Sequence, residues 1–156
     1  MKATLRDVPP PALVLGVAGL VPFVAGAIGA WTLEPEHAGL AIPLQFFYAA
    51  VVLSFLGAVH WGPALAGVGG PPGWGRLTLG VVPCLAGWAL TALDIEPLQM
   101  GLALTLAFPA VLAGDLAAAR RGMAPAWYMA LRTPLTIVAT LSLAASTLRF
   151  VHPPGG

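Results

Sequence analysis

The chain has 156 residues, a length that usually means one domain. Hydrophobic residues make up 58% of it and charged residues 8%, whereas a soluble domain carries about 25% charged residues. This composition excludes a water-soluble globular domain and predicts a single integral membrane domain over residues 1–156, with the lipid bilayer as its partner. The formal net charge of +1 excludes a nucleic-acid-binding protein. The single cysteine, Cys84, excludes an intrachain disulfide and a multi-cysteine metal site.

Five apolar stretches are long enough to cross about 30 Å of hydrocarbon as helices. Because they lack the alternating polarity of barrel strands, we predict an all-α, polytopic membrane bundle of five transmembrane helices. The predicted spans are 12–30, 40–66, 77–93, 98–116 and 129–148. A cleaved signal peptide is the alternative reading of the first, but its apolar run exceeds the roughly 7–15 residues of such a segment.

Prolines lie inside several of these spans, where each removes one backbone hydrogen bond. Pro22, Pro83 and Pro109 lie well inside the first, third and fourth spans and are expected to kink them. Three further prolines lie closer to span ends and should disturb their helices less. These are Pro43, Pro63 and Pro134.

The cations predict the orientation of the bundle. With the amino terminus in the cytoplasm, six of the seven fall on the inner side, and only Arg149 lies outside. The six are Lys2, Arg6, Arg76, Arg120, Arg121 and Arg132. The two outer loops contain four acids and no Lys or Arg, so the positive-inside rule predicts a cytoplasmic amino terminus and a periplasmic carboxyl terminus.

Small residues recur in the second span at strict four-residue spacing, which lets helix backbones approach closely in lipid. They are Ala50, Ser54, Ala58, Gly62 and Ala66. We expect this stripe to pack against another helix, although a chain rich in Ala and Gly can produce such a stripe without packing.

The first and third spans share a pattern. Val21-Pro22-x-x-Ala25-Gly26 matches Val82-Pro83-x-x-Ala86-Gly87, 61 residues later. Two similar hairpins plus a fifth helix would form a parallel repeat of the kind that some transporters use. Coincidence in low-complexity apolar sequence is the alternative interpretation.

Polar residues within spans are the strongest functional clue, and His60, Asp115, Arg132 and Gln45 stand out. At 1.5 Å per residue, the first three lie about 9 Å from the inner ends of their helices. Asp115 has no cation three or four residues away on its own helix, so it needs a partner on another helix. Arg132 is the first choice of partner and His60 the second.

This candidate cluster of His60, Asp115 and Arg132 has three interpretations: a buried clamp that fixes the bundle, an inward-facing pocket, or a proton-handling site centred on His60. The pocket would take an anionic group, a lipid headgroup, a quinone-like ligand or a partner helix. Gly57 should leave space beside the His60 ring, and Ser54 should bond its own backbone. Trp61, Trp127 and Tyr128 are expected to support the cluster. Together with Trp31 and Trp74, they also fall near the predicted span boundaries, where amphipathic rings prefer to lie.

No nucleophile elbow, phosphate loop, histidine pair at metal spacing or twin carboxylate occurs in the sequence. We therefore assign no catalytic residue, no metal ligand and no cofactor. An enzyme is the least favoured class of function.

Two segments resemble a known family. The second span contains FYAAVVLSFLGAVHWG over 47–62, and Asp115 is followed by Pro125-Ala126-Trp127-Tyr128 and Leu131-Arg132. Both are similar to blocks of a family of small bacterial membrane proteins of unknown function, whose eukaryotic relatives are called transmembrane protein sixty-nine. The resemblance implies a multi-pass protein of bacterial inner membranes, with mitochondrial relatives, and brings no activity with it.

Two classes of function follow from these features. The first is an accessory or assembly component of an inner-membrane complex, which contacts other membrane subunits or associates with itself. The second is a small transporter or channel with an inward-facing polar pocket. The possible repeat and the kinked helices favour transport, whereas the absence of a charged residue near the bilayer midplane argues against it.

Overall fold

A computed structural model describes residues 4–68, 70–71 and 73–152. The described residues form helices and no strands, which confirms the predicted all-α class. In chain order the helices are η1 (Leu5–Asp7), α1 (Pro10–Ala18), α2 (Val21–Thr32), α3 (Pro35–Ala58), α4 (Trp61–Leu65), α5 (Trp74–Ala92), α6 (Pro97–Arg120) and α7 (Ala126–Leu148). Lys2, which entered the charge pattern, lies outside the described residues.

Five helical segments are long and apolar enough to cross a membrane: Pro10–Thr32, Pro35–Leu65, Trp74–Ala92, Pro97–Arg120 and Ala126–Leu148. Many large apolar side chains on them point outward, with Leu15 72% exposed, Phe55 69% and Leu65 81%. In water such a surface would be strongly unfavourable, so it fits a lipid environment.

The second segment begins at Pro35 and not at residue 40, because proline is well suited to the first turn of a helix. As a result, the predicted nine-residue outer loop is largely helical. Only Leu33 and Glu34 separate α2 from α3.

The prolines behave differently from the expectation. Pro22 and Pro63 lie just after breaks in the helices, because a proline cannot bond the carbonyl four residues earlier. Those carbonyls belong to Ala18, the last residue of α1, and to Val59, directly after α3. The prediction that Pro63 disturbs its helix little is therefore wrong. Pro83 and Pro109, by contrast, lie inside helices that continue past them.

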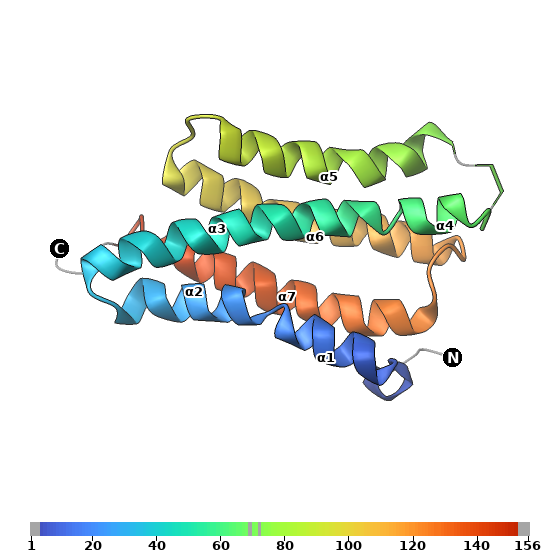
Figure 1. The fold of residues 1–156 in the computed structure, drawn as a ribbon, viewed down its shortest axis with the longest axis horizontal. Coiled ribbons are helices and arrows are strands. Elements are labelled where there is room, and N and C mark those ends of the chain that lie inside the picture. The colour runs from blue at the N-terminus through green and yellow to red at the C-terminus, as the bar shows by residue number, and fades with distance from the viewer. Residues whose placement is uncertain (1–3, 69, 72, 153–156) are drawn as a thin grey trace.

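Helix α3 is the central helix of the bundle, between α2 and α5, with α6 and α7 behind (Figure 1). The core gathers around it, with Phe23 of α2, Phe108 of α6 and Leu143 of α7 packed near Leu53. Helix α5 packs chiefly on α3 and contacts α6 less. In the first hairpin α2 packs closely on α3, so the two hairpins of the suggested repeat are packed differently.

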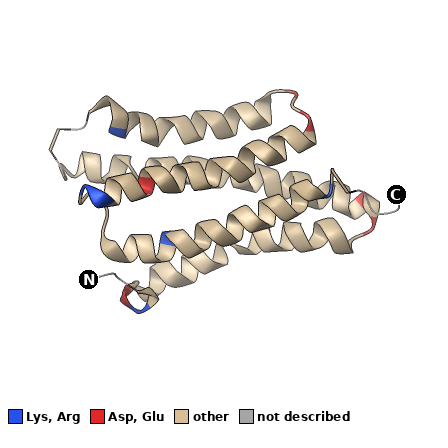
Figure 2. Ribbon diagram, turned by 180° about the vertical axis from the view of Figure 1, so that it is seen from behind, with Lys and Arg blue, Asp and Glu red and all other residues tan. Residues whose placement is uncertain are grey.

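Charged residues gather at the two ends of the bundle (Figure 2). We call the end that holds η1, α4 and the α6–α7 connection the amino-terminal end (Figure 1). The acidic residues of the α2–α3 and α5–α6 connections lie at the opposite end (Figure 2). Asp115 and Arg132, by contrast, are buried inside the bundle, and both belong to the candidate cluster.

The small-residue stripe packs within the chain only in its first half. Ala50 is buried and packs on α5. A Cβ added to Gly87 of α5 would lie only 2.8 Å from the carbonyl oxygen of Ala50. Ala58, Gly62 and Ala66 are exposed, and no described residue lies within 4 Å of a Cβ placed on Gly62. The second half of the stripe therefore does not pack on a helix among the described residues, and the helix is interrupted there at Val59 and His60.

Candidate functional site

The candidate cluster draws its members from three different segments. His60 lies at the junction of α3 and α4, where the break before Pro63 occurs. Asp115 lies near the end of α6, and Arg132 lies in the second turn of α7. Because α6 packs on both α3 and α7, Asp115 comes between the other two. All three are buried, with exposures of 8%, 2% and 5%.

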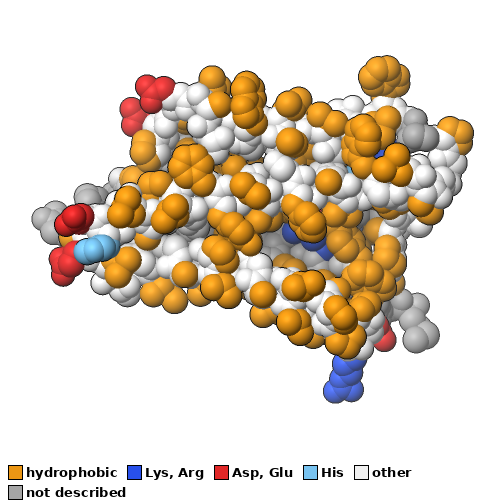
Figure 3. Space-filling view, viewed as in Figure 1, with side chains coloured by type: hydrophobic (Ala, Val, Ile, Leu, Met, Phe, Trp, Pro, Cys, Tyr) orange, Lys and Arg blue, Asp and Glu red, His pale blue; other side chains and the backbone are white. Residues whose placement is uncertain are grey.

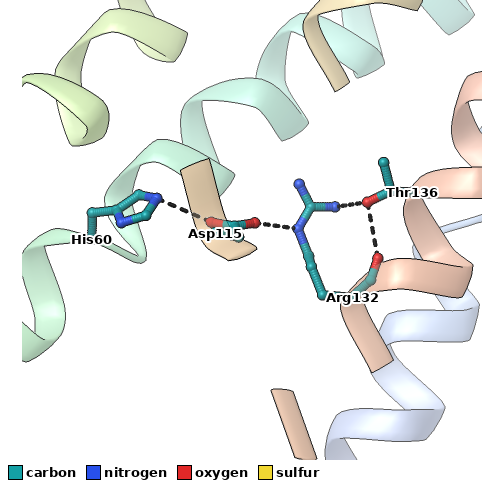
Figure 4. Close-up of polar contacts among 4 residues, drawn as sticks. All are labelled: His60, Asp115, Arg132 and Thr136. Carbon is teal, nitrogen blue, oxygen red and sulfur yellow. Dashed lines mark hydrogen bonds and ion pairs between the residues drawn. The ribbon is translucent and has the colours of Figure 1, made fainter. Parts of the chain in front are cut away.

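The carboxylate of Asp115 contacts both partners, one with each oxygen (Figure 4). Arg132 Nε donates a hydrogen bond of 2.9 Å to Oδ2. His60 Nε2 lies 3.0 Å from Oδ1, at ion-pair distance but without hydrogen-bond geometry. The structure thus brings together the three residues that their distances from the helix ends predicted to lie at one depth. Of the two partners of Asp115, Arg132 is the closer.

Thr136 is a fourth member that the sequence analysis missed. Arg132 Nη1 donates to its hydroxyl, which donates in turn to the backbone carbonyl of Arg132 at 2.9 Å (Figure 4). The two residues are four positions apart on α7, so they share one helix face. That spacing was the available signal. The threonine holds the guanidinium in a fixed orientation toward Asp115.

The residues expected to support the cluster have separate roles. A Cβ on Gly57 would clash with the carbonyl oxygen of Gly80, so Gly57 allows α3 and α5 to approach closely. Ser54 donates to the carbonyl of Ala50 at 3.2 Å, and Trp61 Nε1 donates to the carbonyl of Leu77 at 3.3 Å.

Gln45 lies outside the cluster. Its side-chain amide donates a hydrogen bond of 2.7 Å to the carbonyl of Phe23 and so joins α3 to α2. Gly26 makes this contact possible, because a Cβ there would lie 2.6 Å from Cβ of Gln45. Gln45 is therefore part of a second buried polar contact between helices.

Two of the cavities that border the cluster share part of their lining. One, of about 220 Å³, lies at the amino-terminal end and is lined by His60, Asp115 and Arg76, among others. The other, of about 630 Å³, lies between α1, α2, α3 and α7, and Arg132 lines it. Val59, Trp127 and Tyr128 line both. Trp127 and Tyr128 thus lie between the two spaces.

The chemistry available at this cluster is limited. Asp115 and Arg132 balance each other in charge, and two residues hold the guanidinium in place. Among the residues that the structure describes, no group of three or more His, Cys, Asp or Glu side chains is placed to hold a metal ion. The geometry fits a fixed ion pair between helices with a binding space on either side.

Comparison with known proteins places the chain in a family. Transmembrane protein 69 of Xenopus tropicalis is 35% identical over 150 residues, covering 92% of this chain and 56% of that protein. Transmembrane protein 69 of Mus musculus is 28% identical over 154 residues, covering 97% of this chain and 62% of that protein. The chain thus spans less than two thirds of these relatives.

No solved structure matches the chain significantly. The family model described as a protein of unknown function (DUF3429) matches residues 8–148, which is nearly the whole chain. That match includes all five apolar helical segments and the candidate cluster. The chain therefore belongs to this family of membrane proteins of unknown function, which includes Transmembrane protein 69.

Proposed function

We propose that the protein is a non-catalytic accessory or assembly component of an inner-membrane complex, with its amino terminus in the cytoplasm. The single observation that carries the proposal is the exposed half of the small-residue stripe. Ala50 packs on Gly87, whereas three small residues at the α3–α4 end, Ala58, Gly62 and Ala66, are exposed. In lipid, a face of small residues allows the backbone of another helix to approach closely.

The candidate cluster supports this role by fixing the surface that carries the stripe. His60 lies directly before α4, and its contact with Asp115 ties this short helix to α6. Arg132 extends the tie to α7. A docking surface held rigidly in this way loses little conformational entropy when a partner binds. The expected occupant is a transmembrane helix of another subunit, with a second copy of this chain as an outcome of the test.

The test is purification in a gentle detergent followed by mass spectrometry, with matched glycine variants. Gly62→Leu should remove the partner while the chain stays folded, because a Cβ at Gly62 meets nothing within 4 Å. Gly39→Leu is the control, since Gly39 is equally open but lies at the other end of α3. If both variants keep the same partner in the same amount, or if none is found with the unaltered chain, the stripe is not a docking surface.

A second candidate function is transport, and the observation that favours it is the pair of cavities around the cluster. Trp127 and Tyr128 line both cavities, so a substrate that moved between them would pass these side chains. Transport predicts a monodisperse protein without a stoichiometric partner. It also predicts that a cysteine placed at Met123, in a Cys84→Ser background, changes its labelling rate when substrate is added. A partner recovered in stoichiometric amount favours the accessory role instead.

A further inference from the structure

The larger cavity lies between α1, α2, α3 and α7. Its wall is apolar except at one end, and α1 diverges from the bundle beyond the break at Gly19 and Leu20 (Figure 1). Figure 3 shows a hollow on this face, rimmed by hydrophobic side chains, with basic atoms at its floor. Arg132 is the only Lys or Arg among the described lining residues. The cavity therefore combines a long apolar space with one polar end.

Two buried groups at the polar end make no hydrogen bond of normal geometry with any residue that the structure describes. They are Nη2 of Arg132 and the hydroxyl of Tyr128. In Figure 4 the second terminal nitrogen of Arg132 points away from both Asp115 and Thr136. An arginine nitrogen can only donate, so a ligand that satisfies it must carry an acceptor. A buried donor left unsatisfied is unfavourable, and an acceptor in the cavity would remove this penalty.

The charge balance of the cluster determines which acceptor fits. Arg132 is already paired with Asp115 at 2.9 Å, so an anionic ligand would place an extra negative charge in apolar surroundings. Arg132 lies six residues after the first residue of α7, about 9 Å along the helix, and thus below the headgroup region. A neutral carbonyl oxygen meets both conditions, since it accepts hydrogen bonds without carrying a charge.

The aromatic residues of the wall indicate the shape of the ligand's head. Six aromatic side chains line the cavity, and Trp127 and Tyr128 stand beside the polar end. Their rings are 6.2 Å apart in an edge-to-face arrangement. Aromatic rings of this kind pack well on a flat π-system. The six are Phe23, Tyr48, Phe55, Phe108, Trp127 and Tyr128.

We infer that this cavity binds a neutral amphiphile with a planar head that carries carbonyl acceptors and a long apolar tail, which is the chemistry of isoprenoid quinones. The head lies between Tyr128 and Arg132, and the tail runs along α1 and α3 toward lipid. The inference goes beyond the proposed function and does not rest on it, because the exposed stripe on α4 and this cavity are different surfaces.

The test uses the full chain in phosphatidylcholine nanodiscs, with decylubiquinone as the probe and quenching of tryptophan fluorescence as the measurement. Decylbenzene has a similar tail and ring without carbonyl groups, and it should compete at least fivefold more weakly. Tyr128→Phe should weaken decylubiquinone binding about fivefold, the factor that one neutral hydrogen bond is worth. Its melting temperature should change little, because the lost hydroxyl makes no hydrogen bond of normal geometry with a described residue.

A second pair of variants tests the position of the site. Leu135→Phe narrows the cavity and should weaken binding, whereas Ile137→Phe lies on the same helix outside the cavity and should not. Equal competition by decylbenzene, or unchanged binding in both Tyr128→Phe and Leu135→Phe, would overturn the inference. So would tighter binding of oleate or phosphatidylglycerol, which would assign the cavity to an anionic lipid instead.

Discussion

Removing the charge of Asp115 while keeping the shape of its side chain gives the sharpest test of the buried cluster. Asp115→Asn leaves the guanidinium of Arg132 in the same buried place without its counter-charge. Two opposite unit charges about 4 Å apart attract each other by about 4 kcal/mol when the effective dielectric constant is about 20. Breaking a buried pair by removing one partner costs about 3–5 kcal/mol, so the two estimates agree. We expect a loss of about 4 kcal/mol in the free energy of unfolding.

The measurement is reversible unfolding in mixed micelles, followed by circular dichroism. The control is Asp94→Asn, an exposed acid in the α5–α6 connection, which should change stability by less than about 0.5 kcal/mol. The double variant Asp115→Leu with Arg132→Met removes both charges and should be more stable than Asp115→Asn alone. A loss below about 1 kcal/mol in Asp115→Asn would refute the reasoning, as would a double variant less stable than the single one.

Two further predictions follow from the packing. Gly57→Ala should destabilise the protein by about 1–3 kcal/mol, because the added Cβ would meet the backbone oxygen of Gly80. The control Gly39→Ala should be neutral or stabilising, since a Cβ there meets no described atom within 4 Å. Equal melting temperatures of the two variants would contradict this prediction. Cys84 is exposed on the middle of α5 and should face lipid, so a water-soluble maleimide should label it only after denaturation. Rapid labelling in intact membranes would mean that this face of α5 meets water.

The fold could be predicted largely from hydropathy, because a helix that crosses lipid must be long and apolar. The depth argument brought His60, Asp115 and Arg132 to one level, since distance along a helix follows from residue number alone. Contact between them also required that α6 lie between α3 and α7. The short connection of α6 to α7 suggested half of that arrangement.

Other features depend on three-dimensional packing, which a single sequence does not specify. The partner of Gln45 is the backbone carbonyl of Phe23, and every residue has such a carbonyl. Gly57 contacts Gly80 of α5. Gly80 is 23 residues away in the chain, so the sequence around Gly57 does not reveal this contact. The large cavity depends on the angle between α1 and α3. The break before Pro63 also does not follow from the missing proline hydrogen bond alone, because Pro83 and Pro109 lie inside helices that continue past them.

The central claim is that a bundle of five membrane spans holds its buried ion pair near the cytoplasmic face. The most direct test is a pair of carboxyl-terminal fusions, one to alkaline phosphatase and one to green fluorescent protein, combined with an amino-terminal accessibility tag. We predict an active phosphatase, a dark fluorescent protein and a tag that is protected from reagents outside the cell. A fluorescent carboxyl terminus together with a protected amino terminus would place both ends in one compartment and would contradict the claim.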